Sequence, residues 1–314
     1  MTLIMRNYQS EEDYWRIRAF LREVFLLNNR RQHSWPVTRL DYWRWHLIPN
    51  CNTEDSVESA TFIWETAEGK IAAVVNTEEH GIVAYLHVHP DFRSVELEEE
   101  MLAFAEQRFG NFDAQGRRIL IVSPDQHDTF RKEILTRRGY TRGKGLEYQY
   151  WGTLDKPIPD APIPSGYTVR ALGDVAELPA RSWASWRAFH PDEPDSAYEG
   201  WEWYHNIQRM PLYRRDLDIV VAAPTGEVAS FVTMWYDDTT RTGHFDPMGT
   251  MPEHQRRGLC KAAVCEALRR LQRMGATLAI GVVYEPGPIA VMASVLSDHT
   301  LAESWIKVLA EAEK

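Results

Sequence analysis

One stretch near the C-terminus, residues 242–281, constrains the fold more than any other part of this chain. It begins with an alternation of apolar and polar residues over 242–251, which is typical of a strand, and a polar loop with Gly258 near its end follows. Apolar residues then recur on one helical face at Ala262, Ala263, Ala267, Leu268 and Leu271. Gly275 is placed to end this helix, and residues 277–283 predict a buried strand. The stretch therefore predicts a strand, a turn, a helix and a strand in succession.

The turn before this helix has the chemistry of a phosphate-binding site. The first N–H groups of a helix have no intrahelical partner and lie at the positive end of the helix dipole, so a backbone turn there can hold an anion. Gly258 lets the backbone approach a ligand closely, and Arg256, Arg257 and Lys261 add positive charge. The alternative is an ordinary strand-to-helix turn with a surface arginine pair.

The residues of this turn resemble a known motif. Gln255, Arg256, Arg257, Gly258, Leu259 and Cys260 are similar to the Gln/Arg-x-x-Gly-x-Gly/Ala loop of the GNAT acyltransferase superfamily. That loop binds the pyrophosphate of acetyl-CoA, so the resemblance implies that these residues and Lys261 bind this co-substrate. It also implies that the backbone of Gly249, Thr250 and Met251 pairs with the pantetheine arm. Cys260 departs from the family's Gly or Ala, although Cys is also small.

The composition limits the class of protein. The chain has 314 residues, of which 44% are hydrophobic and 25% charged, as expected for a soluble globular protein of about two domains. The net charge of -10 argues against general nucleic-acid binding. The three cysteines show neither metal-ligand nor disulfide spacing, so we expect a cytoplasmic protein without a metal. We expect no membrane span, because no apolar run approaches the necessary length of about 20 residues, and the N-terminus is too polar for a signal peptide.

The chain shows signs of an internal duplication. Residues 154–166 are rich in Pro and predict a linker between one domain at 1–153 and another at 167–314. Three short segments recur at an offset of about 160 residues, roughly one domain length. The matched segments are 43–45 with 201–203, 68–70 with 225–227, and 89–93 with 251–255. With the resemblance above, this repeat predicts an α/β (α+β) chain of two tandem GNAT folds, each a mostly antiparallel mixed sheet flanked by helices.

The first copy differs from the second at the phosphate-binding loop. In register with the second copy, Glu96 occupies the position of Gly258, and Glu98, Glu99 and Glu100 follow. Carboxylates satisfy a helix N-terminus themselves, and one beside a partly desolvated pyrophosphate costs on the order of several kcal/mol. We therefore expect a degenerate first domain that does not bind the co-substrate. It either forms one wall of the acceptor cleft or is only a packing partner.

The resemblance implies direct attack of an amine on the thioester, which requires a base and N–H donors for the oxyanion. His244 and Asp246 lie two residues apart on the strand before the loop, so both can point to one face. His244 lies where many family members have a glutamate. Glu202 is a third candidate, and polar residues at the end of a strand are the alternative interpretation. Pro247 lacks an N–H and is consistent with a bulge or splay in this strand.

The usual proton donor of the family is missing. Met292 occupies the position of the tyrosine that protonates the leaving thiolate, which leaves Tyr284 or water as substitutes. A protein that binds acyl-CoA without turnover is the other interpretation. We do not expect a nucleophilic cysteine, because Cys260 falls within the pyrophosphate loop and Cys265 has the pattern of a packing residue.

The predicted function is transfer of an acetyl group from acetyl-CoA to the amine of a small-molecule acceptor, by a monomer or a homodimer. A non-catalytic acyl-CoA-binding or scaffolding protein is the alternative, and an enzyme for a non-amine acceptor is a weaker one. Trp186, Trp201 and Trp203 are candidates to line an acceptor pocket for a cationic or aromatic group, with core packing as the alternative.

Overall fold

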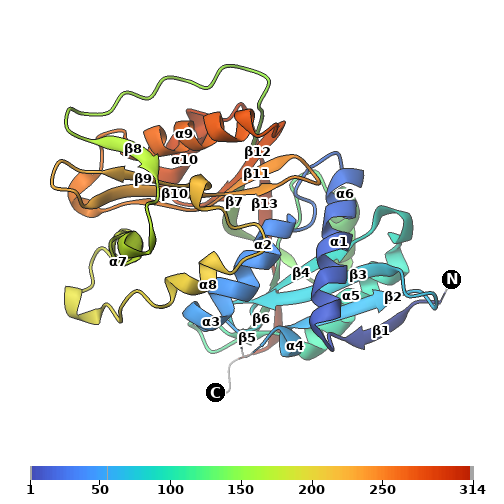
Figure 1. Ribbon diagram of the computed structural model, residues 1–314. Coiled ribbons are helices and arrows are strands. Elements are labelled where there is room, and N and C mark those ends of the chain that lie inside the picture. Colours follow the sequence, from blue (N-terminus) through green and yellow to red (C-terminus); the bar gives the residue numbers. More distant parts are fainter. Residues whose placement is uncertain (1, 55, 312–314) are drawn as a thin grey trace. The chain divides into compact units, whose positions relative to one another are not determined.

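The computed structural model describes residues 2–54 and 56–311, which form two compact units (Figure 1). Unit 1 comprises Met1–Glu147 and Thr300–Lys314, and unit 2 comprises Tyr148–His299. Each unit contains a mostly antiparallel mixed sheet flanked by helices, so the predicted fold class is confirmed.

Unit 1 is built on a sheet in the order β1-β2-β3-β4-β6-β13, and β5 pairs with β6. The pairing of β4 with β6 is parallel, and the others are antiparallel. Its strands are β1 (Ile4–Asn7), β2 (Thr61–Glu65), β3 (Ile71–Glu78), β4 (Val83–Val88), β5 (Asn111–Phe112), β6 (Arg118–Val122), the first part of β7 (Thr141–Thr153) and most of β13 (Asp298–Ala310). Its α-helices are α1 (Glu11–Leu27), α2 (Val37–Tyr42), α3 (Ile48–Cys51), α4 (Val57–Ala60), α5 (Val95–Arg108) and α6 (Thr129–Arg137). A π-helical turn (Trp43–Leu47) and a 3-10 turn (Pro90–Phe92) complete the unit.

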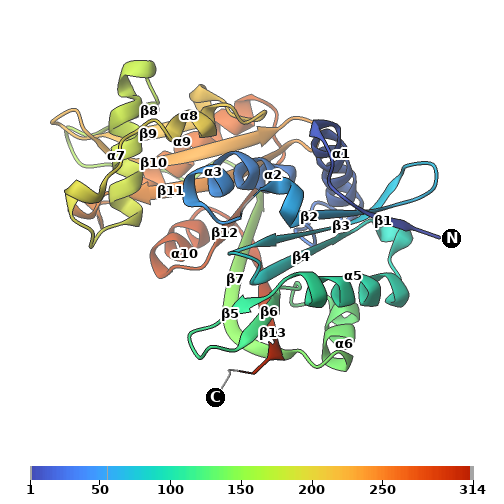
Figure 2. The ribbon, with the colours of Figure 1, turned by 90° about the horizontal axis from the view of Figure 1, so that it is seen from below.

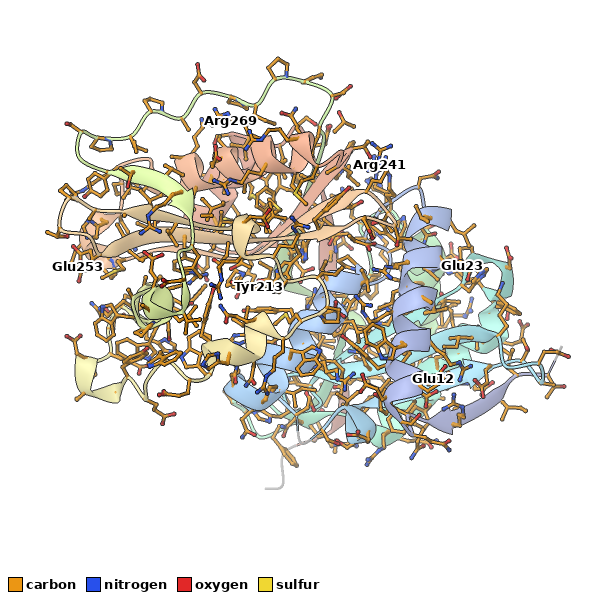
Figure 3. All side chains as sticks on the ribbon, in the orientation of Figure 1. Glu12, Glu23, Tyr213, Arg241, Glu253 and Arg269 are labelled. Atoms are coloured by element: carbon orange, nitrogen blue, oxygen red, sulfur yellow. The ribbon has the colours of Figure 1, made fainter. Side chains whose placement is uncertain are left out.

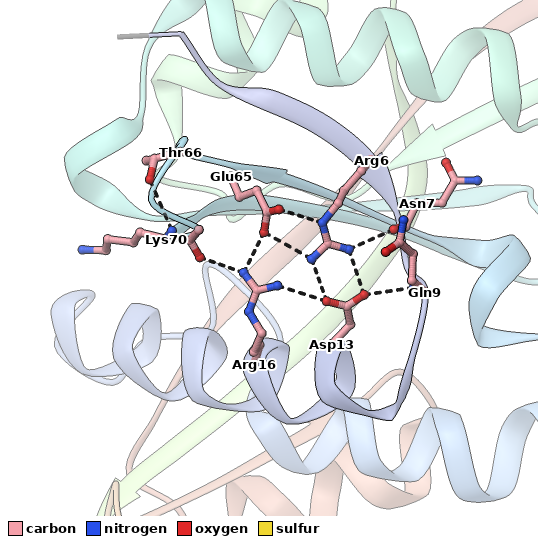
Figure 4. A network of polar contacts seen from close by, with 9 residues as sticks. Arg6, Asn7, Gln9, Asp13, Arg16, Glu65, Thr66 and Lys70 are labelled. Atoms are coloured by element: carbon pink, nitrogen blue, oxygen red, sulfur yellow. Dashed lines mark hydrogen bonds and ion pairs between the residues drawn. The ribbon is translucent and has the colours of Figure 1, made fainter.

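An ion-pair network joins the edge strand of unit 1 to its first helix (Figure 4). The Arg6 guanidinium lies 2.6 Å from Asp13 and 2.7 Å from Glu65, and Arg16 binds the same two carboxylates at 3.1 and 2.6 Å. Each charge has two opposite partners and the side chains are largely buried, so the network is better placed to stabilise the fold than an isolated surface pair. It fixes β1 and α1 to β2.

Unit 2 has the sheet order β8-β9-β10-β11-β12-β7, in which only β11 and β12 are parallel. Its strands are β8 (Thr168–Ala171), β9 (Asp218–Ala222), β10 (Val228–Asp237), β11 (Thr242–Thr250), β12 (Leu278–Val283) and the later part of β7. Its α-helices are α7 (Leu178–Phe189), α8 (Tyr204–Gln208), α9 (Leu259–Arg273) and α10 (Pro286–Ala293). Short 3-10 turns lie at Val175–Glu177, Asp195–Ala197, Arg215–Leu217 and Pro252–His254. Helices α7 and α9 cover opposite faces of this sheet (Figure 1).

The predicted strand, turn, helix and strand of residues 242–281 are confirmed as β11, the loop, α9 and β12. The apolar face of α9 is completely buried at Ala263, Ala267, Leu268 and Leu271. Gly243 brings the helix close to the sheet, because a Cβ there would lie 2.1 Å from Leu271 Cδ1. Local hydrophobic periodicity was therefore a sufficient guide to this part of the core.

Strand β13 completes the sheet of unit 1, although it lies at the C-terminal end of the chain. Its residues pair with β6, with Trp305 opposite Val122, while the later part of β7 pairs with β12 in unit 2, with Tyr150 opposite Gly281. The chain passes from one compact unit to the other between Glu147 and Tyr148 and again between His299 and Thr300. The expected domains at 1–153 and 167–314 stay a prediction about which segments fold together.

The proline-rich segment 154–166 lies along α9 (Figure 1), so it is not a detached spacer. Arg269 donates to the carbonyl of Pro159 at 2.9 Å, and Gln272 donates to the carbonyls of Leu154 and Lys156 at 3.1 and 2.7 Å. Figure 3 shows Arg269 on the side of α9 that faces this segment.

Within the aromatic stretch 198–210, only Tyr204–Gln208 is α-helical. Trp201 and Trp203 lie half-buried in the preceding turn, and Trp186 on α7 stacks on Trp183 with ring centroids 5.3 Å apart. Gly200 adopts a positive φ of 108°, which interrupts the helical pattern. A role for these rings in acceptor binding stays a prediction.

The close contact between α9 and the sheet can be tested with Gly243→Ala. We expect the free energy of unfolding to fall by about 1–3 kcal/mol, because the new methyl group overpacks a buried contact. Gly287→Ala is the matched control, since a Cβ at Gly287 in α10 meets nothing within 4 Å. Urea denaturation measures both variants, and equal stabilities would contradict this packing.

Candidate functional site

The candidate site begins where strands β11 and β12 diverge. Four residue pairs join them, and the last is Phe245 opposite Gly281, although β11 continues to Thr250. Beyond Phe245, β11 stays paired with β10, and their ladder shifts register around Pro247, which confirms the bulge expected there. Strand β12 stays paired with β7. From Asp246 onward, β11 therefore has a strand neighbour on one side only. On this segment the carbonyl of Asp246 accepts from the Trp235 indole and that of Thr250 from Gln255 Nε2 at 3.3 Å, and the rest of the free edge is placed to pair with an extended ligand.

The loop after β11 leads directly to the N-terminus of α9. A 3-10 turn at Pro252–His254 is followed by extended Gln255, Arg256 at a φ of 63° and Gly258 at a φ of 78°. Gly258 is the N-cap residue and has no side chain to cap the helix. Two left-handed residues thus lead the chain into the N-terminus of α9, where free backbone N–H groups and the helix dipole favour an anion.

The cations of this loop have different surroundings. Arg257 donates to the Tyr167 hydroxyl at 2.8 Å and to the carbonyl of Glu253 at 3.2 Å, so it holds the loop in place. Arg256 is exposed and Lys261 half-buried, and neither forms a hydrogen bond or ion pair within the part of the chain that the structure describes. These two side chains are available to a phosphate. A Cβ on Gly258 would meet only the carbonyl of Pro162, at 3.8 Å.

The candidate bases lie on the face of the sheet opposite α9. Gly243 and Phe245 face the core beneath α9, so the alternation of a strand places His244 on the α7 face. His244 is 3% exposed and lies opposite Trp235 of β10. Asp246 is half-buried, and its carbonyl accepts a hydrogen bond from the Trp235 indole. Catalytic roles for His244 and Asp246 remain predictions.

The other residues considered for chemistry are in less suitable positions. Glu202 is exposed and accepts a hydrogen bond from the backbone of Trp201 in the same turn. Met292 is fully buried against Gly281, and Tyr284 is 72% exposed at the end of β12. Burial raises the pKa of the Cys260 thiol to about 12, which disfavours the nucleophilic thiolate at neutral pH. Burial also raises the pKa of Cys265.

A buried polar cluster that was not predicted from the sequence joins α7 to β9 on this face of the sheet. Asp218, at the start of β9, is completely buried and accepts hydrogen bonds from Arg181 Nε at 3.1 Å and from the Tyr213 hydroxyl at 3.0 Å. The Tyr204 hydroxyl donates to the same carboxylate. Figure 3 shows Tyr213 between α8 and the sheet. A charged residue at the first position of an apolar strand was the only sequence signal for this cluster.

The corresponding loop in unit 1 is two residues shorter. The 3-10 turns at Pro90–Phe92 and Pro252–His254 correspond, but α5 begins at Val95 and α9 at Leu259. Ser94, not Glu96, therefore occupies the N-cap position of Gly258, which corrects the expected register. Its hydroxyl accepts a hydrogen bond from the N–H of Leu97 at 3.2 Å, so the helix is capped by its own side chain.

In unit 1, a buried ion pair of Arg131 and Glu98, called the plug below, lies where strands β4 and β6 separate. These strands share only two residue pairs, and Arg131 of α6 reaches the carbonyl of Leu86 on β4 at 3.1 Å. The same guanidinium binds Glu98 of α5 at 2.7 and 3.0 Å, and Glu98 is completely buried. Arg93 binds Glu98 from the other side at 2.7 Å.

Unit 2 has small or uncharged residues at the corresponding positions. Counted from the first residue of each helix, Glu98 of α5 corresponds to Ala262 of α9, and Arg131 of α6 to Pro288 of α10. No side chain of these two positions can form the plug seen in unit 1. In unit 1, charged side chains thus occupy the gap between the separating strands. In unit 2, the corresponding residues have no charged side chain to do so.

No helix among residues 2–54 and 56–311 is long and apolar enough to cross a membrane. Across the same residues, no group of three or more His, Cys, Asp or Glu side chains is arranged to hold a metal ion.

Comparison with known proteins gives one family match. Residues 177–290 match the model of the acetyltransferase (GNAT) family. No curated protein sequence matches the chain.

Solved structures resemble the chain over almost its whole length. A GCN5-related N-acetyltransferase from Sphaerobacter thermophilus is 16% identical with a TM-score of 0.65, and the match covers 99% of this chain and 97% of that one. A tandem GNAT protein from the clavulanic acid biosynthesis pathway, solved without AcCoA, is 12% identical with a TM-score of 0.66, covering 99% and 100%. A GNAT-family acetyltransferase from Colwellia psychrerythraea is 10% identical with a TM-score of 0.59, covering 96% and 99%. At these identities the likeness establishes the fold.

The buried pair in unit 1 predicts a pH-dependent stability. Burial alone would raise the pKa of Glu98, but Arg131 and Arg93 hold it below its ordinary value. The stabilisation is therefore complete at neutral pH and is lost as the pH falls through the acidic range toward the folded-state pKa. Glu98→Gln should lose about 3–5 kcal/mol at neutral pH, because the Arg131 charge stays buried without its carboxylate.

Denaturation at several pH values measures this effect. The difference between wild type and Glu98→Gln should shrink on acidification. Glu99→Gln is the control, because its pair with Arg137 is exposed and contributes about 0–1 kcal/mol. Glu98→Gln and Glu99→Gln variants of the same stability would refute the role of the plug.

Proposed function

Because this chain is a tandem-domain protein of the GNAT superfamily, with a GNAT acetyltransferase domain at residues 177–290, we propose that unit 2 transfers an acetyl group from acetyl-CoA to an amine of a small-molecule acceptor. The observation that carries this proposal is the open edge of β11 leading into the uncapped N-terminus of α9. A strand edge and an anion-binding turn in continuity suit a ligand with a peptide-like arm and a pyrophosphate.

The residues of unit 2 fit acetyl-CoA in two parts. The backbone N–H groups of residues 256–261, together with Arg256 and Lys261, would hold the pyrophosphate. Of Gly249, Thr250 and Met251, the main chain of Thr250 would pair with the amide groups of the pantetheine arm. The N–H of Met251 already donates to the carbonyl of Ala229 at 3.0 Å, and the carbonyl of Gly249 accepts from Ser230. A Cβ at Gly249 would lie 2.7 Å from the Phe231 ring and 2.9 Å from Ala188, so this position requires glycine for close packing.

Acetyl-CoA supplies an activated thioester, and the protein must supply a base for the attacking amine. His244 would accept the proton that the ammonium or the attacking amine loses, directly or through one water, and Asp246 would orient the imidazole. The amine nitrogen forms the new bond to the acyl carbon as the carbon–sulfur bond breaks. Tyr284 or water would return a proton to the thiolate, because Met292 has no proton to donate.

Unit 1 would not bind acetyl-CoA. Its loop lacks two residues, its N-cap is closed by Ser94, and Arg131 already occupies the Leu86 carbonyl. We therefore propose one acetyl-CoA per chain. A non-catalytic acyl-CoA-binding protein is the second candidate, which the burial of Met292 at the usual tyrosine position favours.

Gly258→Glu tests the proposed cofactor loop. It should abolish acetyl-CoA binding, because the carboxylate would lie at the helix N-terminus where the pyrophosphate binds. Thr239→Glu adds the same charge to the exposed hairpin at the other end of β11 and should keep the wild-type affinity. Calorimetry measures both variants and the stoichiometry. An unchanged affinity in folded Gly258→Glu, or two equivalent sites per wild-type chain, would exclude the proposed site.

His244→Ala tests the base. Turnover should fall by roughly 10²-fold or more while acetyl-CoA affinity stays nearly the same, because general-base catalysis contributes about that factor and the loop is intact. Asp246→Asn should have a smaller effect if Asp246 only orients His244. Release of CoA thiol over a panel of amines measures the rate, and acetyl-CoA hydrolysis is a substitute assay. Full activity in both variants would show that this strand supplies no base.

A further inference from the structure

The divergence of β11 from β12 starts at Asp246, and the side chain of Trp235 binds the backbone at that point. The last paired residue is Phe245, and Asp246 belongs to no β11–β12 pair in the described residues. Its carbonyl accepts a hydrogen bond from the indole N–H of Trp235. The first carbonyl beyond the ladder is thus bound by a side chain of β10.

Trp235 is well placed to hold this backbone group in one position. It is 1% exposed and lies opposite His244 in the β10–β11 ladder. The register shift between β10 and β11 gives β11 one extra residue at this level, and such a bulge redirects the local backbone. A buried indole usually forms a hydrogen bond, and here the acceptor is the redirected carbonyl.

The Trp235 ring is itself supported by the buried cluster on the α7 face. Its ring centroid lies 6.0 Å from that of Tyr213, whose hydroxyl donates to Asp218 at 3.0 Å. Asp218 is fixed in turn by Arg181, at 3.1 Å from its Nε. A continuous path of packed and hydrogen-bonded groups thus joins α7 to the point where the strands separate.

We propose that Trp235 is a positioning residue that sets the start of the strand divergence, and so places the β11 main chain that pairs with the pantetheine arm of acyl-CoA. This inference rests on the proposed function. Trp235 does not touch the reacting atoms; it acts through Asp246 and the backbone that follows. The same hydrogen bond holds the β11 segment between His244 and the loop, so one side chain adjusts both the cofactor edge and the candidate base.

Trp235→Phe tests this role, because it keeps an aromatic ring and removes the N–H donor. Acetyl-CoA affinity should fall about 5- to 10-fold, the range expected for one hydrogen bond that orders the binding edge. Adenosine 3′,5′-bisphosphate lacks the pantetheine arm, so its affinity for the α9 loop should not change. Trp64→Phe is the matched control: it removes a buried indole N–H that donates to Glu100 at 2.8 Å in unit 1, and it should bind acetyl-CoA as the wild type does.

Calorimetry with both ligands separates the outcomes. Equal losses for acetyl-CoA and the bisphosphate would indicate a general structural effect and overturn the inference, as would an unchanged acetyl-CoA affinity in Trp235→Phe. Failure of the wild type to bind acetyl-CoA would overturn the proposed function and this inference with it. Should Trp235→Phe not fold, Trp235→His retains a ring N–H donor and should bind acetyl-CoA more tightly than Trp235→Leu, and the opposite order would refute the role.

Discussion

The hydrogen bonding of strand β11 is the constraint on which the architecture of unit 2 depends. Up to Phe245 the strand is paired on both sides, and from Asp246 it is paired with β10 alone. A strand edge inside a domain must be satisfied by protein, water or a ligand, because unpaired buried backbone groups are costly. The bulge at Pro247, the Trp235 indole and the buried Asp218 cluster all lie on the side that keeps β11 attached to β10. The opposite edge is left for a ligand.

In unit 1, a side chain binds the backbone where the two parallel strands separate. Its strands β4 and β6 also separate, but Arg131 reaches the Leu86 carbonyl and brings the Glu98 carboxylate with it. A buried ion pair is costly to desolvate and is effective only when its remaining groups are hydrogen-bonded. Here Arg93 also binds Glu98, and Asp128 binds Arg93 at 2.6 Å, so two carboxylates balance the two guanidinium charges. The two copies share a scaffold and differ in whether side chains or open backbone line the gap.

Local features of this chain were predictable, and features that depend on distant pairing were not. The α9 region followed from helical periodicity and from Gly258, because both act within one turn. The Glu96 assignment failed because two residues are missing from the unit 1 loop, which a constant offset cannot reveal. Arg131 and Glu98 lie on different helices and are 33 residues apart in the sequence. No sequence pattern predicts their contact. The pairing of β13 with β6 and of β7 with β12 joins strands that lie still farther apart in the sequence.

The free edge of β11 supports the proposal that the second copy binds the ligand. A ligand that binds only the folded state stabilises it in proportion to the logarithm of its concentration over its dissociation constant. Unit 2 keeps Ala262 and Pro288 where unit 1 has a charged plug, so it forgoes that internal stabilisation and gains room for a ligand. Gly243 and Gly281 offset part of this loss, because they let Leu271 and Met292 pack directly on the sheet beside the divergence. At the position where the resemblance predicts the proton-donating tyrosine, Met292 instead packs against Gly281 and completes this core.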